Sequence, residues 1–258
     1  MKRQRAWEIT DAFWEAARPL TPKRGRESAR EYRRKPGGGR PAMVSRGVLE
    51  AIFHVLRTGI QWKAPPKDFG AARSIHRYFR FWGEQGFFQA LWVAGLKNHE
   101  EADGIDWTWL CADGCMSKAP LAREAAGKNL TDRGKNGSKR HLLVDGAEAP
   151  LDSFQIERPD ICETPQHLRL DKGCSGEPAL EIVVLRGFIP HVKSRGQEKI
   201  EKRTRPGGRA RRRVVEAALS WMNRFRDIMV RFEKLESSYL GLLMLACAFI
   251  AFRKALVI

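Results

Sequence analysis

Three acidic residues in the C-terminal half of the chain have the setting expected of metal ligands. Asp113 ends the apolar run WTWLCAD, Asp171 follows HLRL, and Glu216 lies in the helical run RARRRVVEAALSWMNRF. We expect the first two at strand ends and the third on a helix. Mg²⁺ prefers hard oxygen ligands and leaves positions open for phosphate and water, so three carboxylates favour a magnesium site for phosphodiester chemistry. The alternative for Asp113, which precedes Gly114, is an ordinary turn residue.

The charge of the chain points to a polyanionic partner. Its 258 residues include 47 Lys and Arg against 30 Asp and Glu, a formal net charge of +17. Such an excess favours DNA or RNA binding, because each neutralised phosphate releases condensed counterions. Ribosomal and membrane-surface proteins share this balance. Five cysteines without paired metal spacing predict neither disulfides nor a zinc module, and favour a cytoplasmic location.

Two segments bear on membrane targeting. The N-terminal MKRQRAWEIT has no apolar segment after it, which argues against a secretory signal. Residues 240–252 form the longest apolar stretch, but Arg253 and Lys254 interrupt it before it reaches membrane-spanning length. We therefore expect a buried helix there and no membrane partner.

The first hundred residues predict a small all-α region. Thr10 can cap a helix, Ser45 begins a second with a wide apolar stripe that Gly59 closes, and residues 71–82 form a third. Helix, turn and basic amphipathic helix are typical of a helix-turn-helix module. The third helix would then present Arg73, Arg77 and Arg80 to DNA. Any basic surface helix gives the same stripe. The basic run of residues 21–40 is a linker that either contacts the DNA backbone or is simply solvated.

Residues 101–258 alternate strand and helix patterns, which predicts an α/β sheet. The expected strands are the one ending at Asp113, then 141–145, 168–171 and 187–192. Helices are expected at 177–185 and around Glu216.

Several blocks of this half resemble a known family. They are LCADGCMSKAP, GKNLTDRGKNGSKRHLLVDG, HLRLDKG, FIPHVKSRG and the long run from Arg209 to Ile250. In this order they are similar to bacterial insertion-sequence transposases of the DDE class, in the superfamily of insertion-sequence families four and five. VLEAIFHVLRTGIQWKAPPKDFG resembles the N-terminal DNA-binding region of the same family.

The resemblance implies a ribonuclease H-like catalytic domain that uses Mg²⁺ or Mn²⁺, with two ions expected. By position, the metal-binding catalytic acids fall on Asp113, Asp171 and Glu216, with an assisting arginine at Arg212. The lysine that usually follows the glutamate falls on Asn223, so Arg224 or Arg226 is expected to supply the phosphate contact, and Lys172 is a further candidate. Implied partners are the terminal inverted repeats and a target duplex, bound by a dimer in the bacterial nucleoid.

The chain departs from this fold in one place. A ribonuclease H-like sheet needs a third antiparallel strand and a crossover helix before the strand that carries the second acid. Between Asp145 and His167 the sequence is short and holds Pro150, Pro159 and Pro165, which is too little for both. An internal deletion near Leu151 and Asp152 is therefore predicted, with an unstable or inactive protein as its expected consequence.

Two other functions remain open. A DNA-binding remnant without catalysis explains the charge equally well, and would bind in EDTA without cutting. A general nuclease of the same fold would cut any duplex, whereas a transposase requires the terminal repeats. A metal-free nucleophile is disfavoured, because neither Ser153 nor Cys115 has an arranged histidine in sequence.

Overall fold

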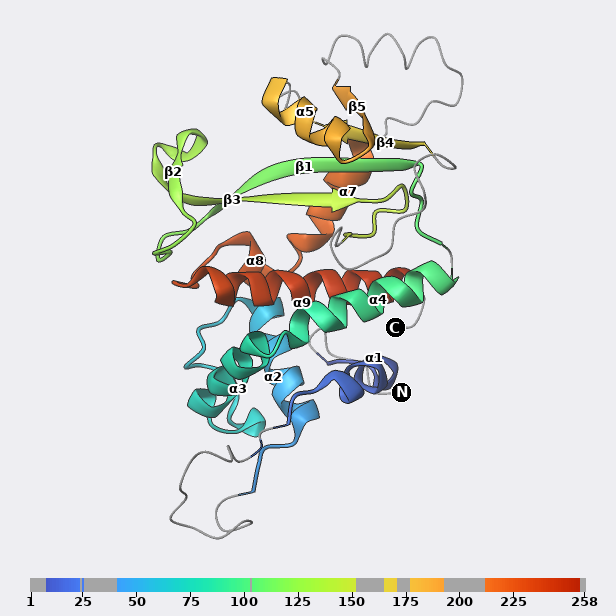
Figure 1. Ribbon diagram of the computed structural model, residues 1–258. Helices are drawn as coiled ribbons and strands as arrows, with labels where there is room; N and C mark the ends of the chain where they lie inside the picture. Colours follow the sequence, from blue (N-terminus) through green and yellow to red (C-terminus); the bar gives the residue numbers. More distant parts are fainter. Residues whose placement is uncertain are drawn as a thin grey trace.

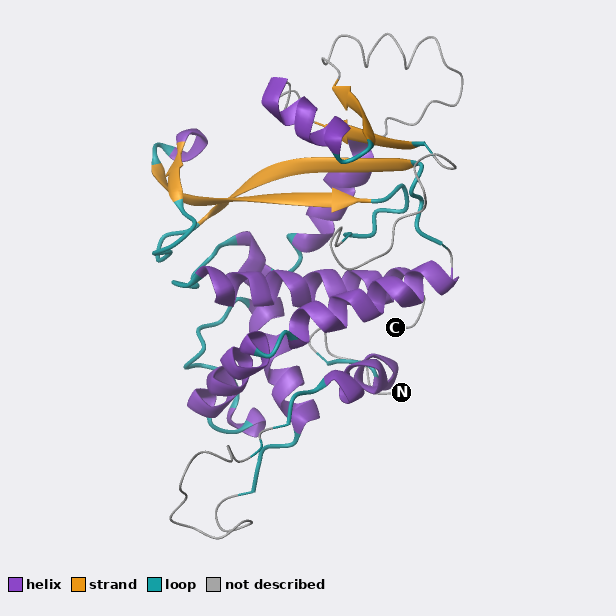
Figure 2. Cartoon of the chain, in the orientation of Figure 1, coloured by secondary structure: helices purple, strands orange, loops and turns teal. Residues whose placement is uncertain are grey.

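The computed structural model describes residues 8–23, 25, 41–102, 104–151, 165–170, 177–192 and 212–255. A five-stranded sheet lies against a group of helices, and the long helices α4 (Phe87–Ala102) and α9 (Glu236–Lys254) lie side by side between the sheet and the N-terminal helices (Figure 1). Figure 2 shows the same division by secondary structure.

The N-terminal helices begin and end where the sequence predicts. Helix α1 (Asp11–Ala17) is capped by Thr10, whose hydroxyl accepts a 3.1 Å hydrogen bond from the amide of Phe13. Helix α2 (Ser45–Thr58) ends at Gly59, which adopts the left-handed conformation with φ 66°. A short 3₁₀ turn, η1 (Arg18–Leu20), follows α1.

The connection between α2 and α3 (Ala72–Glu84) is longer than that of a tight helix-turn-helix. Residues 59–71 separate the two helices and include the 3₁₀ turn η2 (Lys67–Phe69). A tight module of that class uses a turn of roughly three or four residues. The two helices nevertheless pack on each other. Helix α3 buries one face through Ile75, Phe79 and Trp82 and exposes the other.

The sheet has the order β2-β3-β1-β4-β5. Its strands are β1 (Trp109–Lys118), β2 (Gly127–Asn129), β3 (Lys135–Val144), β4 (Gln166–Leu170) and β5 (Phe188–Val192). Strands β2, β3 and β1 pair antiparallel, while β1, β4 and β5 are parallel. The 3₁₀ turn η3 (Leu130–Asp132) joins β2 to β3.

One sequence expectation about Asp113 is wrong. It was expected to end its strand at the rim of the sheet, but β1 continues five residues beyond it to Lys118. Residues 114–118 pair antiparallel with 137–141 of β3, and this pairing extends the strand although aspartate and glycine are poor strand formers. Gly114 is suited to this site because a Cβ there would lie 3.0 Å from the ring of His141.

Beyond β3, at the side away from β1, pairing is fragmentary among the described residues. Strand β2 covers the start of β3, at residues 135–137. At the other end, Val144 forms an isolated antiparallel bridge with Pro150, and the Leu151 amide donates to the carbonyl of Leu143 at 2.9 Å. Residues 152–164, which follow the predicted deletion, lie outside the described part of the chain.

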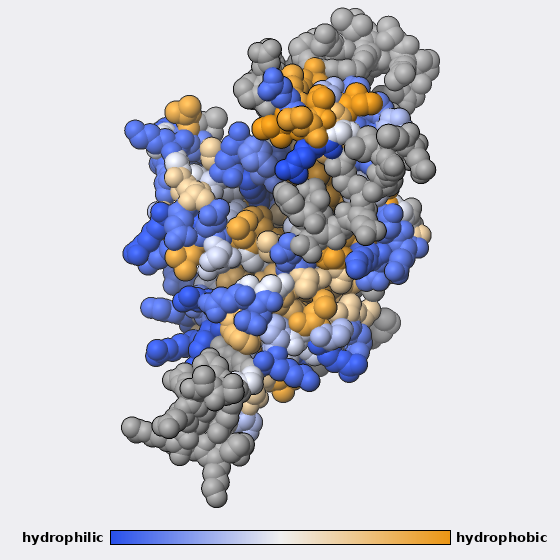
Figure 3. All heavy atoms as spheres, in the orientation of Figure 1, coloured by the Kyte–Doolittle hydropathy of each residue, from blue (hydrophilic) through white to orange (hydrophobic). Residues whose placement is uncertain are grey.

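Helices lie on both faces of the sheet. Helix α5 (Glu177–Leu185) lies in front of the sheet in Figure 1, and α7 (Arg212–Met222) crosses behind it and packs on β1 and β3. Helix α5 carries the exposed Ile182, Val184 and Leu185, and Figure 3 shows apolar atoms gathered at the top of the molecule, where Figure 1 places α5. The short α8 (Arg226–Met229) leads toward α9.

One core joins the two halves of the chain. Phe13, Phe53 and Trp82 of the N-terminal helices share a buried cluster with Val215 of α7 and Leu245 of α9. Among the described residues, α9 alone is long and apolar enough to cross a membrane, yet much of it is buried against α4. It is the central core helix that the sequence predicts.

Candidate active site

Asp113 lies on the face of the sheet that α7 covers. Side chains alternate along a strand, so Asp113 shares a face with Cys111 and Cys115, and it pairs in register with Leu142. Cys111 and Leu142 pack in one buried cluster with Val215 of α7. Asp113 itself is half-buried, and its Oδ1 accepts a 2.7 Å hydrogen bond from the amide of Gly114. The carboxylate is thereby oriented by its own backbone.

The Asp113 carboxylate acts electrostatically on a histidine of the neighbouring strand. His141 of β3 pairs with Gly114. Partial burial lowers the pKa of the His141 imidazole, Lys139 acts in the same direction, and the Asp113 carboxylate opposes both. The histidine is therefore expected to be neutral near neutral pH, which leaves Asp113 without a local cation from this ring.

Glu216 lies on α7, the helix that faces Asp113. The helix is amphipathic and buries Val215, Ala218 and Met222, whereas Glu216 stays exposed at the flank of that stripe. An exposed carboxylate on a helix that packs on β1 can serve as a metal ligand, because solvent and ions have access to its oxygens. Arg212 is the first residue of α7, one turn before Glu216, and its side chain lies outside the described atoms.

A buried arginine ties the end of α7 to the sheet. Arg140 of β3 donates from Nε to Sγ of Cys115 at 2.7 Å and from Nη2 to Oδ1 of Asn223 at 2.5 Å. Its Nη1 also reaches the carbonyl of Ile228 at 3.4 Å. Asn223 directly follows α7 and is seven residues, about two helical turns, after Glu216, so it extends the row of the helix on which Glu216 lies. Arg140 therefore anchors this row to β3, two residues before Leu142, the strand partner of Asp113.

The second predicted acid, Asp171, lies outside the described residues, as does Lys172. Strand β4, which ends directly before Asp171 in sequence, is parallel to β1. Among the described residues no group of three His, Cys, Asp or Glu side chains is arranged to hold a metal ion. The oxygen donors of Asp113 and Glu216 have the hardness that Mg²⁺ or Mn²⁺ prefers, so the donor chemistry of the described part of the site fits such an ion.

The predicted DNA-contacting arginines divide into two groups. Arg73, Arg77 and Arg80 are exposed on one side of α3, and Arg80 makes a 3.7 Å ion pair with Glu84. Arg224 lies far along the sequence, just after α7, where its guanidinium stacks over the Trp221 ring at 3.9 Å. These contacts do not place the two groups of arginines on one surface of the described residues.

Sequence reasoning missed Arg140, together with a pair of arginines, Arg57 and Arg253, that meet Arg224 at a pocket. Arg140 belongs to the basic segment GKNGSKRHLLV, which was interpreted as a loop followed by a strand from His141. Ser138, Arg140, Leu142 and Val144 are buried at alternate positions, as in a strand that begins before His141. No apolar alternation in the sequence marks this earlier start, because Ser138 and Arg140 are polar.

Comparisons with known proteins agree with this architecture. Residues 9–92 match a family model described as "Putative transposase of IS4/5 family", and residues 168–253 match one described as "Transposase DDE domain". No solved structure matches the chain.

Two curated relatives come from Burkholderia cepacia. One, "Putative transposase for insertion sequence element IS402", is 30% identical over 146 residues, which are 50% of this chain and 69% of that protein. The other, "Insertion element IS402 uncharacterized 16.2 kDa protein", is 28% identical over 122 residues, covering 46% of this chain and 79% of the relative. The chain therefore belongs to the IS4/5 family of insertion-sequence transposases, and its C-terminal part is a transposase DDE domain.

Proposed function

We propose that this chain binds the ends of its insertion sequence and catalyses metal-dependent strand cleavage and strand transfer, with Asp113, Asp171 and Glu216 as the metal ligands. The observation that carries the proposal is the placement of Asp113 on the face of β1 that α7 covers, with Glu216 on that same helix. The DDE domain match supports it. A divalent ion bound there would activate the attacking oxygen and stabilise the leaving one.

The residues of the chain would then have separate tasks. Asp113 and Glu216 supply negative charge that offsets the ion beside a polyanionic phosphate, and the Gly114 amide keeps the Asp113 carboxylate oriented. Arg212 would stabilise charge on the phosphate and not act as a base, because an arginine does not lose its proton in this pH range. Arg140 holds the Glu216 row of α7 against β3. Hydrolysis and strand transfer are the same in-line displacement with two nucleophiles.

DNA recognition would be divided between the two regions of the chain. Arg73, Arg77 and Arg80 offer three cations along one side of α3, which is suited to phosphate or groove contact. Lys172 and Arg224 would contact the backbone near the reacting phosphate. The net charge of +17 supplies the non-specific attraction to DNA that precedes end recognition. Two ends must be paired, so a dimer on DNA is part of the proposal.

The second candidate is a catalytically defective transposase that only binds DNA. It is favoured by the fragmentary pairing at the outer edge of β3, where an isolated bridge at Val144 and Pro150 is found in place of a third full strand among the described residues. If the deletion is real, the sheet loses a neighbour and the strand before Asp171 loses its crossover helix. DNA binding by α3 would survive such a loss.

Cleavage of a duplex that carries the terminal repeat of the element separates these candidates. The wild-type protein and Asp113→Asn are compared in Mg²⁺ and in EDTA, with Glu181→Gln on α5 as an exposed acid control. Metal-dependent cutting in the wild type and in Glu181→Gln, but not in Asp113→Asn, supports catalysis. Binding without cutting in all three proteins supports the remnant, and equal cutting of a duplex without the repeat supports a general nuclease.

A further inference from the structure

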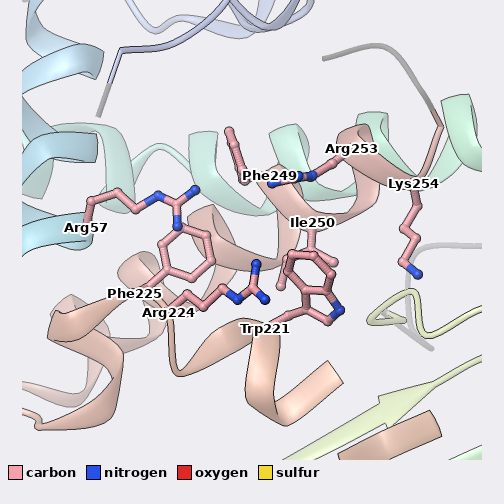
Figure 4. A pocket seen from close by; sticks show the side chains of 8 residues that line it. All are labelled: Arg57, Trp221, Arg224, Phe225, Phe249, Ile250, Arg253 and Lys254. Atoms are coloured by element: carbon pink, nitrogen blue, oxygen red, sulfur yellow. The ribbon is translucent and has the colours of Figure 1, made fainter. Parts of the chain in front are cut away.

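A basic pocket of about 230 Å³ lies where the N-terminal helices meet the C-terminal part of the chain. It lies between the end of α2, the segment after α7 and the last turns of α9. Figure 4 shows the eight described residues that line it, which are Arg57, Trp221, Arg224, Phe225, Phe249, Ile250, Arg253 and Lys254. Four of them are basic and none is acidic.

The positive charge of this pocket is only partly compensated. Lys254 turns away in Figure 4 and pairs with Glu148 at 3.2 Å. The guanidinium groups of Arg57, Arg224 and Arg253 remain at the pocket. Burial lowers the pKa of Arg57, and the charges of Arg253 and then Arg224 lower it further. Arg57 is therefore a partly buried cation beside the exposed guanidinium groups of Arg224 and Arg253.

Aromatic rings hold these cations in place. Arg57 lies over Phe225 at 4.5 Å and over Phe249 at 5.1 Å from the ring centroids, and Arg224 and Arg253 lie over Trp221 at 3.9 and 5.2 Å. Stacking offsets part of the repulsion and occupies the guanidinium faces. The N–H edges remain available as donors. The buried Nε of Arg57 has no hydrogen-bond partner among the described residues.

We propose that this pocket binds one phosphate group, held by the guanidinium edges of Arg57, Arg224 and Arg253. A phosphate offers the oxygens and the negative charge that three converging guanidinium groups require, and the match of guanidinium to phosphate is bidentate. A stacked nucleobase is a poorer match, because Arg224 already lies over the Trp221 ring.

The phosphate can come from the DNA backbone or from free phosphate in solution, and the pocket chemistry is the same for both. The DNA source rests on the proposed function and deepens it. Arg57 lies in the segment that matches the IS4/5 family model, while Trp221, Arg224 and Arg253 lie in the DDE domain. One backbone phosphate would therefore join the N-terminal region to the catalytic region when DNA is bound.

The first test uses inorganic phosphate without DNA or metal. Calorimetry and thermal unfolding are measured for the wild type, Arg253→Gln, Arg57→Lys and Arg18→Gln, with chloride at matched ionic strength as the blank. Arg18 is an exposed arginine that pairs with Glu15 and does not line the pocket, so its variant removes the same charge elsewhere. We expect phosphate to bind and to raise the unfolding temperature, and binding to weaken about tenfold or more in Arg253→Gln but not in Arg18→Gln.

Arg57→Lys keeps the positive charge but loses the planar guanidinium with its paired N–H donors. If this variant binds phosphate more weakly, while its unfolding temperature in the absence of phosphate is unchanged, the guanidinium makes a directed contact. The exposed Arg253 provides the variant with the smaller folding risk. The pocket assignment is overturned if wild-type protein does not bind phosphate, or if Arg253→Gln and Arg57→Lys both bind it as tightly as Arg18→Gln does.

The second test identifies the source. Duplex affinity is measured over a range of salt concentrations for the same proteins in EDTA. If the phosphate belongs to DNA, Arg253→Gln reduces the slope of log affinity against log salt by about 0.9 relative to Arg18→Gln, and free phosphate competes with the duplex. Unchanged slopes together with lost phosphate binding assign the pocket to a free anion. Neither test requires cleavage, so a cleavage-defective chain can still pass both.

Discussion

Arg140 on β3 donates a 2.5 Å hydrogen bond to Oδ1 of Asn223, the residue directly after α7, and also bonds to Cys115 on β1. The contact joins the sheet that carries Asp113 to the helix that carries Glu216. Asn223 stands where the resemblance places a lysine, and a lysine there would face the buried guanidinium of Arg140.

Asn223→Lys is therefore expected to destabilise the protein by about 1–3 kcal/mol, since it removes an acceptor from a charged donor and adds a like charge beside it. Asn223→Asp should keep or increase stability, because a carboxylate accepts the same bond with charge assistance. Urea unfolding measures both changes. Ser220→Lys, which adds a charge to an exposed position of α7, serves as the control. Equal stability of Asn223→Lys and Ser220→Lys would mean that the Arg140 contact contributes nothing.

A pair of buried carboxylates predicts an unusual pH dependence of stability. Burial, and then the charge of Glu233, raise the pKa of Asp227 to about 8. Burial also raises the pKa of Glu233, while its bond from Trp62 opposes the shift. The folded chain thus holds protons that the unfolded chain has released. The free energy of unfolding should fall as pH rises from about 4 to about 8, between the unfolded and folded pKa of Asp227.

Asp227→Asn should flatten this fall, because the amide cannot ionise, and should stabilise the protein most at the high end of the range. Chemical unfolding at a series of pH values tests it, with the exposed Asp68→Asn as control. A slope in Asp227→Asn as steep as that of the wild type would rule out Asp227 as its source. Part of the slope is expected to remain, since Glu233 still titrates.

The exposed arginines of α3 should contribute to DNA affinity through charge. Arg73→Gln and Arg77→Gln are each expected to lower duplex affinity and to reduce the salt slope by about 0.9, since each removes one phosphate contact. Binding titrations at several salt concentrations provide the measurement. Arg18→Gln, which changes an exposed arginine outside α3, should leave the slope unchanged. Slopes identical to that of the wild type in both α3 variants would remove this helix from the DNA interface.

The elements that local chemistry determines were predicted well from the sequence. The Thr10 cap, the end of α2 at Gly59 and the burial of α9 all follow from residue type and periodicity. The position of Asp113 within its strand did not, because β1 is prolonged by pairing with β3, a contact between segments distant in sequence. Arg140 was missed for the same reason.

The pocket could not be predicted at all. Arg57 and Arg253 are separated by most of the chain, and each has the appearance of a surface arginine at the end of an amphipathic or apolar helix. Only the packing of α2 and α9 about Phe225 and Phe249 brings their guanidinium groups to one site. The second acid, Asp171, stays a sequence prediction.

The central claim is that Asp113 and Glu216 act in one metal-dependent site, and a double-mutant cycle on single-turnover cleavage tests it most directly. Wild type, Asp113→Asn, Glu216→Gln and the double variant are compared on a terminal-repeat duplex in Mg²⁺. If both acids serve one site, each single change should lower the rate by about a thousandfold or more, and the double variant should be little slower than either. Rate losses that multiply, or a single variant that cleaves at the wild-type rate, would contradict the shared site.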